Sequence, residues 1–347
     1  MMTVTITPVT DDGASTEVTG NLTNVTDSIP HIEVASDVML IFFGFVILIG
    51  IIGSIANGLV LRVLLSPKLR MQTSNLLITN QVAMDLYSCI NLIVSYVSRL
   101  PRLRLTGTWG WFLCVFIQTD VMTFVGLTGS TASVGAITAE RYFKVVYPIA
   151  HRKNFRNWMI YATIPLTWII GVLKNIAGIW TSAVIDGICN GFSYWPTAEL
   201  ATGFAIFNLI WQFFLPLLLF IYSYWHILAV VRGQMKVFSG HQDNDTVAQQ
   251  TAANKAQMNV ITTMIGICLA FFVCWTPNQI YFLLTVIGYE LDNQIYYVTV
   301  FLIFLNTNLN PFIYAVKHEA VKRGLRQMFG ITANNITVAP ATSATMA

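Results

Sequence analysis

Seven long apolar segments constrain the fold of this chain more than any other feature. A helix needs about 20 mostly apolar residues to cross the hydrocarbon core of a membrane. Charged residues make up only 10% of the chain, and mean hydropathy is +0.63, so it lacks the polar surface of a soluble globule. The sequence therefore predicts an all-α membrane protein, a seven-transmembrane helix bundle with spans at 38–64, 75–98, 113–139, 157–180, 200–231, 258–287 and 295–315.

The basic residues predict the orientation of this bundle. An odd number of spans puts the two termini on opposite sides, and short cytoplasmic loops carry the excess of Lys and Arg. Of the 19 Lys and Arg residues, 15 fall in the first, third and fifth connections or near and after the last span. We therefore expect the N-terminus to be extracellular.

The two terminal regions differ from the membrane domain of 38–315. Residues 1–37 are polar and acidic without Lys or Arg, which is typical of a disordered tail. Asn21 and Asn24 begin glycosylation sequons. No basic region followed by an apolar core precedes the first span, which we expect to start insertion itself. Residues 316–329 predict an amphipathic interfacial helix, followed by a short cytoplasmic tail, 330–347; the apolar stripe of that helix is Val321, Leu325, Met328 and Phe329.

The five cysteines do not predict a disulfide framework. Cys114 and Cys189 lie at or beyond the external boundary, where disulfides persist. We therefore expect a bridge between them, which would tie the loop after span four to the top of span three. The other three cysteines are expected to be small core residues.

Polar residues inside the spans mark candidate sites, because they are costly in lipid. One interpretation is that neutral groups such as Asn80 simply link helices by hydrogen bonds. Asp85 needs more, since a carboxylate at mid-membrane depth requires a proton, or a cation with oxygen-rich neighbours. Ser130 and the Asn306/Asn310 pair, four residues apart on one helix face, are candidates for that role.

Prolines add a mechanical feature. Pro165, Pro216, Pro277 and Pro311 interrupt four long spans, which bundled membrane helices tolerate. We expect kinks there, about which half of a helix can swing.

Enzyme and transporter alternatives are disfavoured. All five histidines lie outside the membrane or at its edge, and neither a His-Glu-x-x-His nor a Gly-x-Ser-x-Gly motif occurs. A secondary transporter would show repeated halves with matching broken helices, and the sequence has no such symmetry. We expect a non-enzyme without a resident cofactor.

Motifs on all seven spans carry a resemblance. Over residues 38–329 the chain resembles a class A, rhodopsin-like G-protein-coupled receptor, closest in character to the peptide receptors. The motif residues are Asn57; Asn80 and Asp85; Glu140-Arg141-Tyr142; Trp168; Pro216 with Tyr224; Phe271, Cys274-Trp275 and Pro277; and Asn310-Pro311 with Tyr314.

The resemblance implies roles for these residues. Asp85, Ser130, Asn306 and Asn310, near Trp275, match the surroundings of an allosteric sodium ion in the inactive state, and its loss accompanies an inward turn of Tyr314 and Tyr224. The implied activation residues are Glu140, Arg141, Tyr142, Tyr224, Phe271, Trp275, Pro277, Pro311 and Tyr314. Pro148-Ile149, with Arg141, matches the contact for a heterotrimeric G protein, and arrestin is a further implied partner at the plasma membrane.

Three departures from the family pattern stand out. Cys114 lies two residues farther from Arg141 than in most members, so the top of span three is expected to bulge or the disulfide to sit higher. Gln81 and Thr131 replace apolar residues.

The ligand class follows from what is absent. Thr123 stands where amine receptors have an aspartate, and Phe304 where light receptors have a lysine. A neuropeptide-like ligand is therefore expected, with a small amine or a lipid as the alternative. The candidate pocket is Asp120, Thr123, Phe124, Lys174, Trp275, Asn278, Gln279 and Tyr281.

Two questions about charge stay open at this point. Asp120 is expected either to meet a basic group of the ligand or to pair internally with Lys174. Arg99, Arg102 and Arg104 are interpreted mainly as a solvated face, with an acidic ligand or the acidic tail as the alternative.

Overall fold

A computed structural model describes residues 37–70, 73–101, 104–191, 194–238, 244–287, 289 and 291–330. Several predicted features lie outside these residues: the sequons at Asn21 and Asn24, Arg102, and residues 331–347 of the expected cytoplasmic tail.

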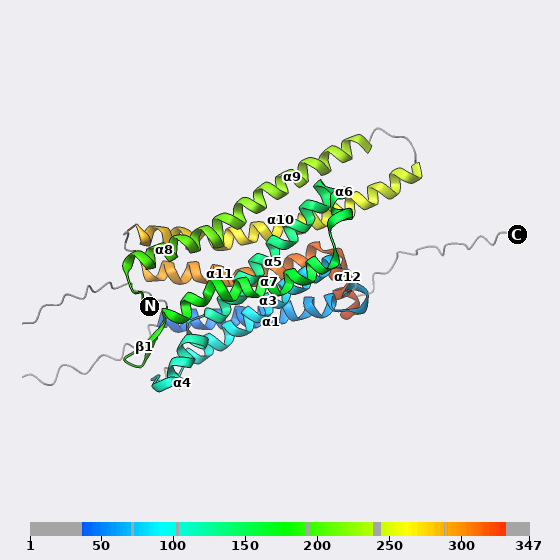
Figure 1. Cartoon of the computed structure of the whole chain (residues 1–347). Coiled ribbons are helices and arrows are strands. Elements are labelled where there is room, and N and C mark those ends of the chain that lie inside the picture. Colours follow the sequence, from blue (N-terminus) through cyan, green and yellow to red (C-terminus); the bar gives the residue numbers. More distant parts are fainter. Residues whose placement is uncertain are drawn as a thin grey trace, which may run out of the picture.

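Seven helical segments are long and apolar enough to cross a membrane, and they lie side by side as one bundle (Figure 1). This confirms the seven predicted spans. Spans one to seven are α1 (Asp37–Leu64); α3 (Thr73–Arg99); α4 (Gly107–Phe112), η1 (Leu113–Gln118) and α5 (Val121–Val146); α7 (Asn157–Trp180); α8 (Ala198–Leu209), η2 (Ile210–Phe214) and α9 (Leu215–Phe238); α10 (Asn244–Val286); and α11 (Asn293–Lys317).

The bundle is apolar outside and partly polar inside, the reverse of a soluble globule. Ile41, Ile55 and Val273 are each more than half exposed, whereas Asn57 and Asp85 are fully buried. Span three packs against spans two, four and five. Its approach to span four is close, since a Cβ on Gly171 would lie 2.4 Å from the carbonyl oxygen of Val125.

Spans three and five each contain a π-helical turn, η1 and η2. In span three the turn ends before Asp120, whose φ of 60° is left-handed, a costly conformation for a residue with a side chain. Of the two alternatives expected at the top of span three, the structure shows the bulge.

A hairpin lies between spans four and five. β1 (Ala183–Ile185) pairs antiparallel with β2 (Ile188–Asn190). Asp186 and Gly187 form its two-residue turn with φ of 53° and 79°, the positive values that suit the twist of a tight hairpin. The Asp-Gly pair between apolar residues is a hairpin signal that could have predicted this feature. The predicted fold rested on the membrane spans and did not use this signal.

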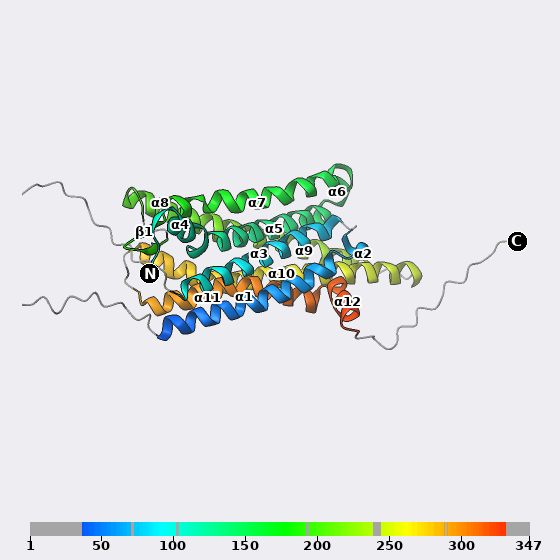
Figure 2. The same ribbon diagram turned by 90° about the horizontal axis from the view of Figure 1, so that it is seen from below.

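Short helices cluster at the opposite end, with α2 (Pro67–Arg70), α6 (Pro148–Asn154) and α12 (Glu319–Met328) (Figure 2). The helix expected after span seven is thus present. It packs on span one, because Val321 is fully buried and a Cβ on Gly324 would lie 2.3 Å from Val63. We call the end of the bundle that carries α2, α6 and α12 the α12 end, and the opposite end the disulfide end.

Candidate functional site

The core of the bundle holds a cluster of polar side chains around Asp85. Its Oδ2 accepts hydrogen bonds from Nε2 of Gln81, at 2.8 Å, and from Nδ2 of Asn310, at 2.9 Å. Its Oδ1 has no hydrogen-bond partner among the described residues, and the same is true of the Oδ1 atoms of Asn306 and Asn310. Three buried oxygens thus remain available as ligands.

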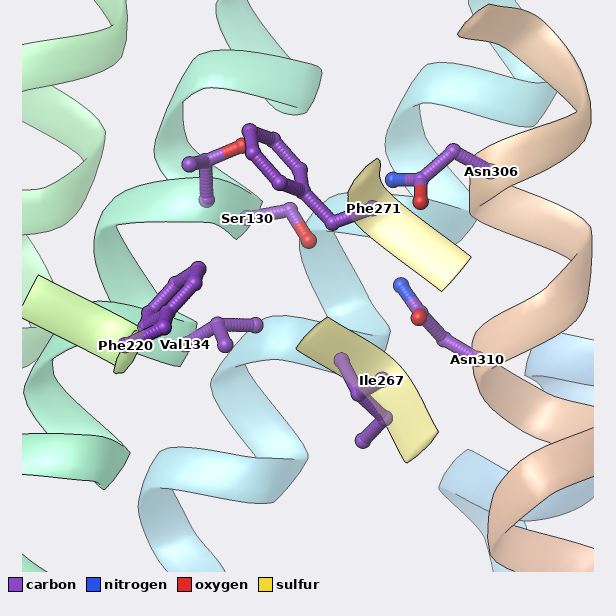
Figure 3. Close-up of a pocket in the computed structure, with 8 residues that line it drawn as sticks. Ser130, Val134, Phe220, Ile267, Phe271, Asn306 and Asn310 are labelled. Atoms are coloured by element: carbon purple, nitrogen blue, oxygen red, sulfur yellow. The ribbon is translucent and has the colours of Figure 1, made fainter. Parts of the chain in front are cut away.

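A small cavity adjoins this cluster. Asn306 and Asn310 project from span seven toward Ser130 of span three (Figure 3). The cavity measures about 10 Å³, which is room for one water molecule or one small ion. Unpartnered carboxylate and amide oxygens are ligands that hard cations prefer, so these residues fit a sodium ion.

Phe271 of span six and Phe220 of span five line this cavity. Trp275 is buried, and the ring of Phe271 lies 5.6 Å from its ring. Phe271 in turn meets Phe220 of span five edge-on at 6.0 Å. The order Phe220, Phe271, Trp275 joins spans five and six just beside the polar cluster.

Two buried tyrosines lie between the cluster and the α12 end. The hydroxyl of Tyr314 donates to Oε1 of Gln81, and the hydroxyl of Tyr224 pairs with that of Thr138 at 3.1 Å. Both tyrosines therefore point into the bundle. The sequence did not reveal the role of Gln81 as a link between Asp85 and Tyr314. It indicated only that a polar residue replaces an apolar one at this position.

The Glu140-Arg141-Tyr142 segment ends span three. Nε of Arg141 lies 3.2 Å from Oε2 of Glu140, with both side chains largely buried. Tyr142 turns toward span five, where its hydroxyl lies 3.0 Å from Nδ1 of His226. Beyond it, Pro148 begins α6 and Ile149 is 84% exposed, so that apolar side chain is free to bind a partner.

His318 stands at the junction of span seven and α12. Its ring meets that of Tyr314 edge-on at 6.1 Å. Burial, and then the charge of Arg141, lower the pKa of His318 to about 4, and Glu319 opposes the shift. This imidazole is therefore neutral near pH 7.

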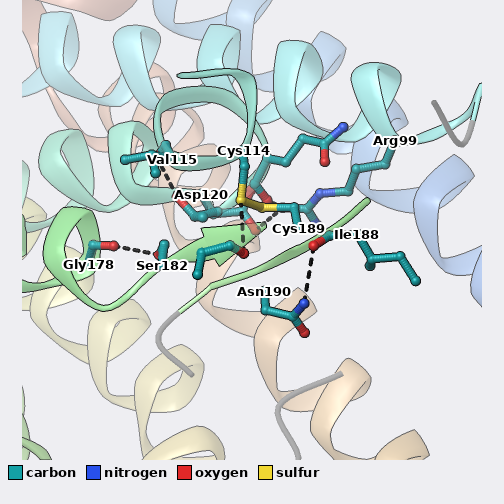
Figure 4. The surroundings of a disulfide bond; sticks show 12 residues. Arg99, Cys114, Val115, Asp120, Gly178, Ser182, Ile188, Cys189 and Asn190 are labelled. Atoms are coloured by element: carbon teal, nitrogen blue, oxygen red, sulfur yellow. Dashed lines mark hydrogen bonds and ion pairs between the residues drawn. A yellow bond between two sulfur atoms is a disulfide. The ribbon is translucent and has the colours of Figure 1, made fainter. Parts of the chain in front are cut away.

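At the disulfide end, Cys114 and Cys189 are bonded as predicted, with Cα atoms 5.1 Å apart. Beside them, Arg99 of span two and Asp120 of span three approach each other (Figure 4). Nη2 of Arg99 lies 2.6 Å from Oδ2 of Asp120, and the hydroxyl of Ser95 donates to Oδ1 at 2.6 Å. The guanidinium also lies over the ring of Tyr96, 4.3 Å from its centroid.

This pairing corrects two interpretations of the sequence. Asp120 does not pair with Lys174, and Arg99 does not belong to a solvated face. The π-helical turn η1 and the left-handed backbone of Asp120 interrupt the regular helix here. The Asp120 side chain therefore points toward Arg99 on span two. Arg104 remains exposed, next to Gly187.

The remaining candidate pocket residues are spread over three spans. Thr123 is buried on span three, and the ring of Phe124 lies 6.1 Å from Phe304. Lys174 is half-buried on span four. No ion pair of Lys174 is found in the described part of the chain.

Two of the span six candidates, Asn278 and Tyr281, contact span seven. Asn278 donates to the hydroxyl of Thr299 at 3.1 Å, which ties span six to span seven just above Pro277. Tyr281 packs against Tyr296, with ring centroids 5.5 Å apart, and lines an apolar groove of about 380 Å³ between these spans. Gln279 is half-buried. Tyr281 therefore lies beside span seven.

Comparison with known proteins agrees with this architecture. The chain is 23% identical over 317 residues to galanin receptor 2a of Danio rerio, covering 89% of this chain and 82% of that one. It is 25% identical over 296 residues to the neuromedin-K receptor of Homo sapiens, covering 83% and 60%. The crystal structure of squid rhodopsin superposes with a TM-score of 0.69 at 20% identity, covering 84% and 86%. Residues 56–314 match the 7 transmembrane receptor (rhodopsin family), and the chain belongs to this family, the class A G-protein-coupled receptors.

Proposed function

We propose that this receptor binds an extracellular peptide at the disulfide end and activates heterotrimeric G proteins at the α12 end. The observation that carries the ligand class is the pair of relatives named for galanin and neuromedin-K, both peptides. Thr123 and Phe304 support it, because amine and light receptors have other residues there. The excess of basic residues toward the α12 end supports an external N-terminus.

The ligand pocket lies above Trp275, between the outer halves of the spans. Thr123, Phe124, Asn278 and Gln279 are its candidate lining, with half-buried Lys174 on span four as a further candidate. Asp120 is already compensated by Arg99, so a basic ligand group that used this carboxylate would have to displace the guanidinium.

Activation follows from differential affinity. A ligand that binds the G-protein-binding arrangement more tightly shifts the population toward it. Sodium held by Asp85, Ser130, Asn306 and Asn310 would stabilise the resting arrangement by compensating the buried carboxylate. Movement of span six about Pro277 would then alter the contacts of Phe271 and Trp275.

The α12 end provides the partner surface. When span six moves outward, the Arg141 side chain leaves Glu140 and a helix of the G protein enters the cleft. Exposed Ile149 gives this partner an apolar contact beside the basic residues of α6. Arrestin would use the same opening.

A screen for G-protein activation in intact cells tests the ligand class. The panel contains amidated and free-acid peptides, with amines and lipids as competing classes. A peptide response that disappears in Arg141→Ala, at equal surface expression, supports the proposal. A response to amines or lipids alone would keep the receptor family and reject the peptide, while a full response in Arg141→Ala would reject the mechanism.

A further inference from the structure

Gln81 is the one residue that joins the Asp85 cluster directly to Tyr314 in the described part of the chain. It lies on span two, one turn before Asp85, and is fully buried. Its Oε1 accepts from the hydroxyl of Tyr314, and its Nε2 donates to Oδ2 of Asp85 at 2.8 Å. Asn310 donates to the same oxygen at 2.9 Å. A continuous hydrogen-bonded path therefore runs from span seven through span two and back to span seven.

The chemistry of this path suits an amide. A glutamine presents an acceptor and a donor on one rigid group, so it can serve a hydroxyl and a carboxylate at once. Leucine and methionine offer neither, glutamate cannot donate when ionised, and asparagine is one methylene shorter. Because an unpartnered amide is costly away from water, both bonds hold Gln81 in place.

The path leads to the part of the receptor that meets its partner. Tyr314 lies in the last turn of span seven, its ring meets His318, and α12 begins at the next residue, Glu319. At the other end, Oδ1 of Asp85 has no partner among the described residues. A cation bound at Oδ1 of Asp85 would change how strongly Oδ2 accepts from Gln81, and linked hydrogen bonds polarise one another.

We propose that Gln81 is a positioning residue that couples the state of Asp85 to Tyr314, and through it to the α12 end of span seven. The coupling itself is a property of the fold. Its consequence for signalling rests on the proposed function.

The coupling is tested by a double-mutant cycle on purified receptor. Gln81→Met removes the amide with little change of shape, and Tyr314→Phe removes only the hydroxyl. We expect each change to lower Tm by about 2–4 °C and the double variant to lower it no further than the larger single change. Additive losses would overturn the proposal.

A matched control shares no bond with the path. The hydroxyl of Ser133 accepts from Asn80 on another face of span two, at 3.2 Å. Ser133→Ala should therefore add its own loss to that of Tyr314→Phe. If Gln81→Met does not fold, the cycle of Asp85→Asn with Tyr314→Phe decides, because these two residues are linked through Gln81; independence of the two would overturn the proposal.

A signalling cycle tests the consequence. With Gln81 present, Asp85→Asn should change the rate of nucleotide exchange on the G protein about fivefold or more; in the Gln81→Met background the same change should have a markedly smaller effect. Equal effects in both backgrounds would overturn the role in signalling. If the receptor activates no G protein, the proposed function fails and the unfolding cycle still decides whether the coupling exists.

Discussion

Span three is regular where it passes the polar core and irregular where it approaches the disulfide. Along Val121–Val146 the α-helix is continuous, and Ser130 lines one cavity with Asn306 and Asn310, as its candidate role near Asp85 requires. Between Leu113 and Asp120 a π-helical turn and a left-handed residue intervene, and Asp120 meets Arg99. Spacing along a sequence therefore locates a side chain only as far as the helix remains regular.

The largest expected effect comes from breaking the ion pair in the irregular region. Arg99→Gln leaves the Asp120 carboxylate largely buried without its cation, which should lower the free energy of unfolding by about 3 kcal/mol. Thermal unfolding of purified receptor measures the loss. Arg99→Gln combined with Asp120→Asn should cost less than Arg99→Gln alone, and a larger cost for the double variant would contradict a specific pair.

The next effect lies at the other end of the bundle and depends on pH. The pKa of His318 is lowered from its ordinary 6.5 to about 4. The folded state binds this proton less readily than the unfolded state. The contribution of neutral His318 to the free energy of unfolding is therefore fully present above pH 6.5, and it is lost as the pH falls toward 4. By linkage the loss at pH 5 is about 2 kcal/mol.

His318→Gln provides the comparison for that prediction. Unfolding of both proteins at pH 7.5 and pH 5 should show a smaller pH-dependent loss in the variant. An equal loss in both would assign the pH dependence to other groups.

A smaller effect sharpens the description of the core. If sodium occupies the site at Asp85, replacing an organic cation by sodium at constant ionic strength should weaken binding of the activating peptide about tenfold. Asp85→Asn should remove that dependence, because it deletes the anionic ligand. Wild-type affinity that does not respond to sodium would refute the site.

The smallest effect is expected from an exposed pair in α12. Nζ of Lys322 lies 3.9 Å from Oε1 of Glu319, with side chains 33% and 52% exposed. Lys322→Gln should change the free energy of unfolding by less than about 0.5 kcal/mol. A loss as large as that of Arg99→Gln would show that charge pairing, rather than burial, sets the cost at both ends.

Much of the fold followed from the sequence because membrane helices have a fixed minimum length. The seven spans, the Cys114–Cys189 bridge and the helix after span seven are all present. Spans five and six extend beyond their expected ends at 231 and 258, because α9 continues to Phe238 and α10 begins at Asn244.

The parts that escaped prediction depend on contacts between spans. Gln81 bonds to Asp85, four residues away, but also to Tyr314 on span seven, and no pattern within span two indicates the second partner. The Arg99–Asp120 pair likewise depends on a local break in helix geometry. The long spacing between Cys114 and Arg141 indicated such a break, but not the direction in which the Asp120 side chain would point.

Nucleotide exchange on purified heterotrimeric G proteins tests the central claim most directly. The receptor is reconstituted in vesicles with the peptide found by the screen, and each main G-protein family is offered in turn. We expect at least one heterotrimer to exchange nucleotide faster with wild type, and Arg141→Ala to lose this acceleration while still binding peptide. Peptide binding by the wild type without acceleration of any heterotrimer would contradict it.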